Sequence, residues 1–252
     1  MLNSPWLYPL LFVTGLVAGC VDSIAGGGGL ITLPILLGVG IPPTLALGTN
    51  KFQSSFGSFT ASHHFVSKNV VSMRDARLGI AFTLIGAALG TWTVQQISSG
   101  VLGYIIPIML AAIIVYSFFA PKFGEIDVHP KFNRTTFYVI FGLALGFYDG
   151  FFGPGVGSFW TILLILGLGM NILKATGYTK VMNFTSNVVA LTLFAIGGNV
   201  WVAIGACMAV GQIIGARLGS WLVIHKGARF VRPVFLTMVV LTTLKLIYSR
   251  FF

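Results

Sequence analysis

The chain contains two aspartates in closely matching apolar surroundings, and this repetition constrains its fold more than any other feature. Asp22 lies in residues 15–29 and Asp149 lies in residues 142–155, and these segments align without a gap at a spacing of 127 residues. The whole chain has only five acidic residues. An acidic residue inside a membrane segment is costly, so its default interpretation is functional. A matched pair predicts a duplicated transporter whose site lies where the two halves meet.

Two further blocks of sequence repeat at a nearly constant spacing. ALGTNK at residues 46–51 aligns with ATGYTK at 175–180, and GAALGTW at 86–92 aligns with GARLGSW at 215–221, both 129 residues apart. Three collinear blocks predict a single transmembrane transporter domain over residues 1–252 that contains a duplication. Repeat 1 covers about residues 1–119, a linker covers 120–134, and repeat 2 covers about 135–252.

The composition is that of a membrane protein. Hydrophobic residues make up 56% of the chain and charged residues 8%, whereas a soluble domain has roughly 25% charged residues. The apolar runs are continuous, which favours helices over the short alternating segments of a barrel. At about 20 residues per span, the chain has room for about eight membrane segments. We therefore predict an all-α integral membrane protein, with residues 7–25 as a retained span rather than a signal peptide.

The net charge of +10 reflects membrane orientation rather than nucleic-acid binding. The basic residues gather in the short loops at 67–77, 120–134 and 224–232. Such loops are cytoplasmic under the positive-inside rule, so the linker is expected on the cytoplasmic face and no nucleic-acid partner is expected. If the broken pair of each half enters the membrane and returns as a hairpin, the first half begins outside the membrane and the second half begins inside. The sequence thus predicts two inverted repeats, with both termini outside.

Each half begins with a glycine-rich broken helix. Glycine and proline interrupt a helix and free backbone groups that lipid cannot satisfy, so matched breaks indicate a transport site. Close helix packing through small residues is the alternative, and it explains Gly15, Gly19, Gly142 and Gly146 better than it explains four consecutive glycines. The expected helical segments are 7–25, 30–41, 45–66, 78–97 and 101–119, then 135–152, 158–169, 173–196, 200–223 and 233–250. The broken pairs among them are 7–25 with 30–41 and 135–152 with 158–169.

Asp22 and Asp149 each lie beside a break, and two roles are open to them. A carboxylate there accepts hydrogen bonds from the broken backbone, as a helix cap does. Alternatively, it takes up and releases a proton and so couples transport to a proton gradient. Both roles make the residues essential, so loss of activity alone does not separate them.

Lys51 and Lys180 are matched cations within apolar spans. Each has polar neighbours at helical spacing, among them Asn50 and Asn183, which indicates a buried or wet face. Snorkelling of the lysines to the membrane interface is the alternative. Together with the N-termini of helices beside the breaks, the lysines favour a small anion as substrate. The predicted substrate and ion pathway comprises Asp22, Gly26, Gly27, Gly28, Gly29, Asn50, Lys51, Asp149, Gly153, Gly155, Lys180 and Asn183.

The sequence does not predict an enzyme, a cofactor or a metal site. It contains no nucleotide-binding P-loop and no HExxH motif. His63 and His64 are adjacent and therefore do not share a helical face. Any transport is therefore secondary active or passive.

Several of these motifs resemble the sulfite exporter TauE/SafE family of membrane proteins. They are DSIAGGGG at residues 22–29 with Pro34, ALGTNK at 46–51, GFYDGFFGP at 146–154, and the Lys180, Asn183 and Asn187 pattern. The resemblance spans nearly the whole chain. It implies a multi-pass permease of the bacterial inner membrane whose substrates are small anions, often sulfur-containing, such as sulfite, sulfonates and related carboxylates.

The sequence therefore predicts a secondary permease that moves a small anion, coupled to a proton or sodium ion. Its other expected partners are membrane lipid and a second copy of the chain in a homodimer. A passive anion channel and a membrane assembly subunit without transport of its own remain alternatives, because both would share these motifs.

Overall fold

The computed structural model describes residues 5–118 and 129–226, which form helices and turns with no strand among them. The first half contributes α1 (Leu7–Ala25), α2 (Gly28–Gly38), α3 (Pro43–Ser67), α4 (Met73–Gln95) and α5 (Ser99–Phe118). The second half contributes α6 (Arg134–Phe137), the π-helical turn η1 (Tyr138–Gly142), α7 (Leu143–Phe151), α8 (Val156–Leu168), α9 (Ile172–Ile196) and α10 (Val202–Lys226). The predicted all-helical class is confirmed.

The helix boundaries follow the predicted segments closely, apart from the start of α4. This helix begins at Met73 rather than near residue 78, because Ser72 caps it: the Ser72 hydroxyl accepts a hydrogen bond from the Asp75 main-chain N–H at 3.4 Å. The expected span 233–250 and residues 120–128 of the linker lie outside the described residues.

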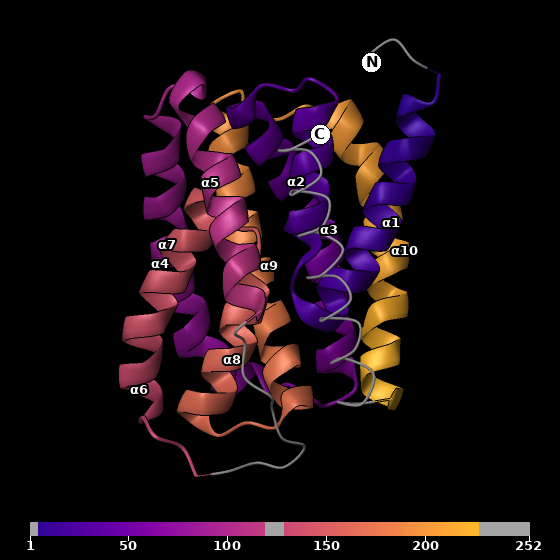
Figure 1. The fold of residues 1–252 in the computed structure, drawn as a ribbon. Helices are drawn as coiled ribbons and strands as arrows, with labels where there is room; N and C mark the ends of the chain where they lie inside the picture. Colours follow the sequence, from indigo (N-terminus) through magenta and orange to yellow (C-terminus); the bar gives the residue numbers. More distant parts are fainter. Residues whose placement is uncertain (1–4, 119–128, 227–252) are drawn as a thin grey trace.

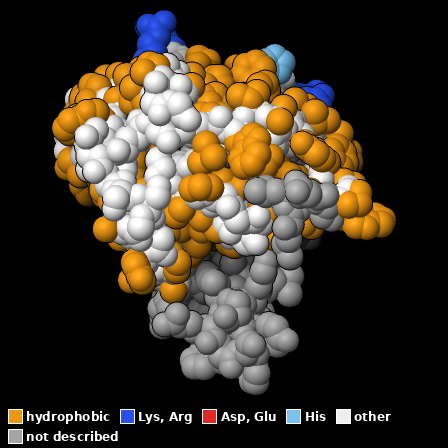
Figure 2. All heavy atoms as spheres, turned by 90° about the horizontal axis from the view of Figure 1, so that it is seen from above, with side chains coloured by type: hydrophobic (Ala, Val, Ile, Leu, Met, Phe, Trp, Pro, Cys, Tyr) orange, Lys and Arg blue, Asp and Glu red, His pale blue; other side chains and the backbone are white. Residues whose placement is uncertain are grey.

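Four of the described helices, α1, α4, α9 and α10, are long and apolar enough to cross a membrane. Helices α2 and α8 and residues 99–112 of α5 form shorter apolar helices. Large hydrophobic side chains are exposed around the outside, including Trp92, Ile108, Ile196 and Leu218. Figure 2 shows the end of the molecule where α1 begins: hydrophobic side chains cover much of its described surface, and the visible Lys and Arg lie along one edge. The count of eight membrane segments stays a prediction.

The least apolar long helix lies at the centre of the bundle. Helix α3 packs against α9, α10 and α2, and α9 packs in turn against α4 and α8 (Figure 1). Both central helices bury polar side chains, which lipid would not solvate, so these helices face each other and their neighbours. Asn50 on α3 and Asn183 on α9, the polar neighbours predicted for the two lysines, are therefore interior.

The helix that precedes each break packs against a helix of the other half. Helix α1 lies along α10, and α7 lies along α4. Glycines make both contacts close: a Cβ added to Gly215 would lie 2.0 Å from the Leu16 carbonyl oxygen, and one added to Gly90 would lie 2.0 Å from the Phe147 carbonyl oxygen. Gly15 and Gly146 face the partner backbone in the same way. The small-residue packing role expected for these two glycines is confirmed.

Both predicted helix breaks are present, and each reverses the chain. Helix α1 ends at Gly26, whose φ of +77° is a left-handed conformation that favours glycine, and α2 then returns. Between α7 and α8 the chain passes Gly153 and Gly155, at φ values of +97° and +82°. In Figure 1, α1 begins at the top and α6, which leads into α7, begins at the bottom. The two broken hairpins therefore approach the middle from opposite ends.

Candidate functional site

The tips of the two broken hairpins meet at the centre of the molecule. A Cβ added to Gly26 would lie 2.4 Å from the Gly157 carbonyl carbon, so the two backbones touch. The Ser158 hydroxyl donates a hydrogen bond to the Ala25 carbonyl oxygen at 2.9 Å. Gly29 lies against Pro154 in a similar way. Glycine at these positions allows the two turns to approach more closely than side chains would permit.

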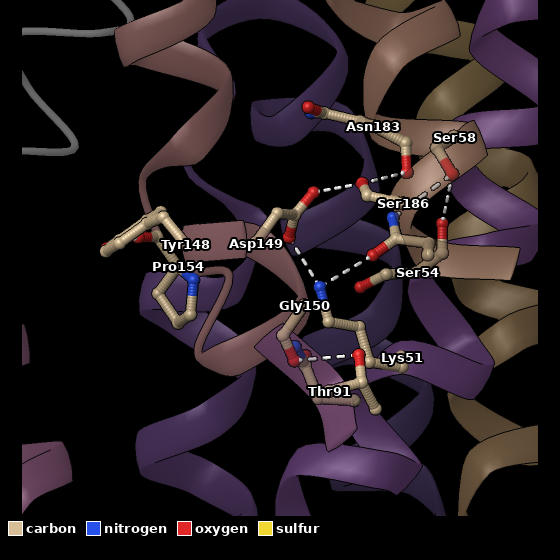
Figure 3. Close-up of polar contacts among 12 residues, drawn as sticks. Lys51, Ser54, Ser58, Thr91, Tyr148, Asp149, Gly150, Pro154, Asn183 and Ser186 are labelled. Carbon is tan, nitrogen blue, oxygen red and sulfur yellow. Dashed lines mark hydrogen bonds and ion pairs between the residues drawn. The ribbon is translucent and has the colours of Figure 1, made fainter. Parts of the chain in front are cut away.

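A buried ion pair links the two halves beside this contact. The Lys51 ammonium on α3 lies 2.5 Å from the Asp149 Oδ1 on α7, and the side chains are 2% and 3% exposed. Figure 3 shows the ammonium pointing at this carboxylate, with Ser186 on the carboxylate's other side. The Ser186 hydroxyl donates to Asp149 Oδ2, and Lys51 also donates to Asn187 Oδ1 at 3.1 Å. Both oxygens of Asp149 therefore have donors, which offsets the cost of burying the charge.

A second ion pair repeats this link with the halves exchanged. The Lys180 ammonium on α9 lies 3.0 Å from Asp22 Oδ2 on α1, and it also donates to the Asp22 main-chain oxygen. Lys180 is fully buried, while the Asp22 side chain is 24% exposed. The lysine of each half therefore pairs with the aspartate of the other. Because Lys51 and Lys180 are both buried, the interpretation that they snorkel to the interface is wrong.

The two matched aspartates contact different groups. Asp22 Oδ1 accepts a hydrogen bond at 3.2 Å from the main-chain N–H of Gly28, the first residue of α2. That contact is a capping role of the kind foreseen from the sequence. Asp149 instead accepts from the side chains of Lys51 and Ser186. Whether either aspartate takes up a proton stays a prediction.

A small polar cavity lies between these groups. Nine of the twelve predicted residues line it, whereas Gly27, Gly28 and Lys180 do not. The cavity has a volume of about 30 Å³, which is room for a water molecule or two. Its lining consists of Asp22, Gly26, Gly29, Asn50, Lys51, Ser54, Asp149, Gly153, Gly155, Val156, Asn183 and Asn187.

The starts of two helices border this cavity from opposite sides. Gly29 belongs to the first turn of α2, while Gly155 and Val156 form the start of α8. A helix N-terminus carries a partial positive charge and N–H groups without helical partners, so both ends favour an anion. Asn183 is 4% exposed, and its Oδ1 has no hydrogen-bond partner. The Nδ2 group of the same amide is a donor, so this end of the side chain can bind an anion in the cavity that Asn183 lines.

Comparison with known proteins places the chain in a family. The sequence profile of Sulfite exporter TauE/SafE matches residues 11–246. The chain belongs to the sulfite exporter TauE/SafE family. It is 43% identical over 246 residues to "Probable membrane transporter protein YfcA" of Escherichia coli K12, covering 98% of this chain and 91% of that protein.

Two further relatives of this TauE/SafE chain are also described as membrane transporters. A "Probable membrane transporter protein" of Haemophilus influenzae is 41% identical over 244 residues, covering 97% of this chain and 96% of the relative. "Probable membrane transporter protein ORF9" of a Sinorhizobium species is 38% identical over 241 residues, covering 96% and 92%. No solved structure gives a significant match. The TauE/SafE chain is thus a membrane transporter, and its substrate is left unspecified.

Sequence reasoning missed one matched pair of contacts in this TauE/SafE chain. The Thr32 hydroxyl on α2 donates to Asn50 Oδ1 at 2.5 Å, and in the second half the hydroxyls of Thr161 and Thr179 lie 3.0 Å apart. Each contact ties the short helix of a broken hairpin to the central helix that follows it. Thr32 and Thr161 are 129 residues apart, which is the spacing of the repeats. The repeat alignment therefore contained the signal that identifies this pair.

Proposed function

We propose that the chain is a secondary permease that moves a small anion across the bacterial inner membrane. The observation that supports this best is the cavity at the hairpin tips, where two helix N-termini and the Lys51 ammonium converge. These are groups that bind anions in proteins. The family description favours a sulfur-containing anion such as sulfite or a sulfonate, and a small carboxylate fits the same chemistry.

The proposal includes two inverted repeats with about eight membrane segments. The exchanged contacts support it: α1 lies on α10 as α7 lies on α4, and each lysine pairs with the aspartate of the other half. The opposite entry of α1 and α6 in Figure 1 also fits. Repeat 1 then covers about residues 1–119 and repeat 2 about 135–252, joined by a cytoplasmic linker. Inverted repeats of this kind move against each other around a fixed central site.

The size of the cavity favours a carrier over a passive channel. A space of about 30 Å³ holds a water molecule or two and is too small for sulfite or a carboxylate. The ion pairs and the contact of Gly26 with Gly157 join the halves around it. An anion therefore enters only when the halves move apart, which is expected of a carrier that opens to one side at a time.

The amide of Asn183 provides a direct test of this site. Asn183→Ala is expected to weaken binding of the transported anion about tenfold, because one hydrogen bond to a charged ligand is worth about 1.5 kcal/mol or more. The measurement is thermal stabilisation of the purified protein by sulfite, thiosulfate, sulfoacetate, taurine, sulfate and short carboxylates. The melting temperature without anion should change little, because the Asn183 Oδ1 has no partner to lose.

The matched control is Asn69→Ala, since Asn69 lies in the loop between α3 and α4, away from the central cavity. This variant should bind the anion as tightly as the unmodified chain. Equal stabilisation of Asn183→Ala and the unmodified chain by every stabilising anion would contradict the proposed site. An absence of stabilisation by any anion would favour another substrate or a role as a membrane assembly subunit.

A further inference from the structure

We propose that Asp22 carries one proton with each transported anion, while Asp149 stays ionised as the fixed partner of Lys51. This inference rests on the proposed anion permease and assigns its coupling ion. It also gives the two matched aspartates different tasks.

The charges around the cavity cancel before any anion enters. Two buried ammonium groups, on Lys51 and Lys180, face the carboxylates of Asp149 and Asp22. A monovalent anion added to this set leaves one negative charge without compensation in a poorly solvated region, which is costly. A proton on one aspartate restores neutrality. The cluster therefore favours an anion that arrives together with a proton.

Asp149 is poorly placed to accept that proton. Its side chain is 3% exposed, and its two oxygens accept from Lys51 and from Ser186. Protonation would weaken the pair with Lys51 and leave a buried ammonium less well compensated. The access of water to this carboxylate is limited to the small cavity that Asp149 lines. Asp149 therefore remains the charge that holds Lys51.

Asp22 is better placed, because its side chain is 24% exposed, against 3% for Asp149, although both line the cavity. Lys180 also donates to the Asp22 main-chain oxygen, so it keeps an acceptor when the carboxylate is protonated. The cluster then carries one net positive charge, which an incoming anion balances from the cavity, although Lys180 itself does not line it. Protonation of Asp22 thus prepares the site for the anion without leaving the lysine unbonded.

The difference between the aspartates has a cause in the repeat alignment. Ser186, which donates to Asp149, stands at the 129-residue spacing from Gly57. An added Cβ at position 57 would lie 2.3 Å from the Gln212 Oε1, which is the end of a flexible side chain. The first half has a glycine, without a hydroxyl, at the place where the second half has a serine. The asymmetry is therefore present in the sequences of the two repeats.

Other titratable groups near α1 do not replace this role. Helices α2 and α8 carry no titratable side chain, and the cavity receives Lys51 from α3 and Asp149 from α7. The remaining titratable side chains on α1, α3, α9 and α10 do not line the cavity; they are Tyr8, Cys20, His63, His64, Lys174, Tyr178, Cys207, Arg217, His225 and Lys226. Asp22 faces Lys180 directly and Lys51 and Asp149 across the cavity.

The proposed cycle balances charge at each step. A proton from water on the loading side adds to an Asp22 carboxylate oxygen, and the anion that enters the cavity balances the net positive charge of the cluster. The cluster is neutral before and after loading. On the other side of the membrane the anion and the proton leave together, and the Asp22 carboxylate pairs again with Lys180.

Infrared difference spectroscopy tests the protonation site without any substrate. The spectrum of the purified full chain is compared between acidic and alkaline buffer, and the carbonyl band of a protonated carboxylic acid is followed. With only five acidic residues, the band is assignable by substitution. We expect the band of a cavity carboxylic acid to be lost in Asp22→Asn and kept in Asp149→Asn. A band kept in Asp22→Asn and lost in Asp149→Asn would overturn the inference.

Two additions keep this test decisive. If Asp22→Asn does not fold, Asp22→Glu retains a carboxyl group and should shift the band, whereas an unshifted band would contradict the assignment. Uptake of labelled methanesulfonate, a monovalent anion that carries no proton near neutral pH, is then measured in liposomes. An inward proton gradient should stimulate uptake by the unmodified chain. The stimulation is expressed relative to the rate of anion exchange of the same protein, and it should be lost in Asp22→Asn. Exchange that is insensitive to the gradient in the unmodified chain would overturn the coupling but leave the permease standing.

Discussion

Lys51→Met is expected to destabilise the protein by about 3–5 kcal/mol, because it leaves the Asp149 carboxylate buried without its counter-charge. Lys51 and Asp149 lie 2.5 Å apart and are 2% and 3% exposed, so water reaches the remaining carboxylate only through the small cavity that both residues line. The hydroxyl of Ser186 would remain as a donor, which is too little to compensate a full charge. The measurement is equilibrium unfolding in detergent, followed by tryptophan fluorescence.

The double variant Lys51→Met/Asp149→Asn is the control for this prediction. Removing both charges leaves no unpaired charge, so the double variant should recover most of the stability that each single variant loses. The cycle thereby separates the ion pair from the packing of the lysine side chain. Additive losses in the double variant would contradict a direct interaction between the two residues.

Gly26→Ala should have an effect of similar size, roughly 2–5 kcal/mol, from two sources. The φ of Gly26 is +77°, a left-handed conformation that costs alanine about 1–2 kcal/mol. The new Cβ would also lie 2.4 Å from the carbonyl carbon of Gly157, and overpacking adds about 1–3 kcal/mol. The same unfolding measurement applies. Gly26 caps α1 and Gly157 lies in the first turn of α8, both at the hairpin tips, so relief of this contact requires the halves to separate.

Gly40→Ala isolates the two sources. Gly40 also has a positive φ, of +95°, but a Cβ added there meets nothing within 4 Å. Its substitution should therefore cost only the conformational part, about 1–2 kcal/mol. If Gly26→Ala and Gly40→Ala were equally destabilised, the hairpin tips would not be in close contact, and the described centre of the molecule would be wrong.

The local structure was predictable because it depends on local sequence. Residues 7–25 were expected as a helix and form α1, since an apolar run ends there at a glycine that adopts a left-handed conformation. The break after α7 follows from Gly153 and Gly155 in the same way. The start of α4 was misplaced, because Ser72 extends the helix with a cap that hydropathy alone does not reveal.

The residues that form the site were easier to predict from the sequence than the ion pairs that they make with one another. The matched positions of Asp22 and Asp149 and of Lys51 and Lys180 indicated a common site, and nine predicted residues do line one cavity. The sequence predicts that the two lysines hold an anion, whereas in the structure each lysine forms an ion pair with the aspartate of the other half. Such a partner lies on a distant helix, so it is set by packing between repeats and not by local spacing. The small volume of the cavity depends on that packing too.

Counterflow through liposomes tests the central cavity as an anion pathway most directly. Vesicles that contain the full chain are preloaded with unlabelled sulfite, and entry of labelled sulfite is followed in the unmodified chain and in Ser54→Leu. Ser54 lines the cavity, so the larger side chain fills its limited volume. We expect the preload to accelerate entry in the unmodified chain and have no effect in Ser54→Leu. Equal acceleration in both proteins would contradict a pathway through this cavity, and no acceleration with sulfite or with the other anions of the panel would contradict the anion permease.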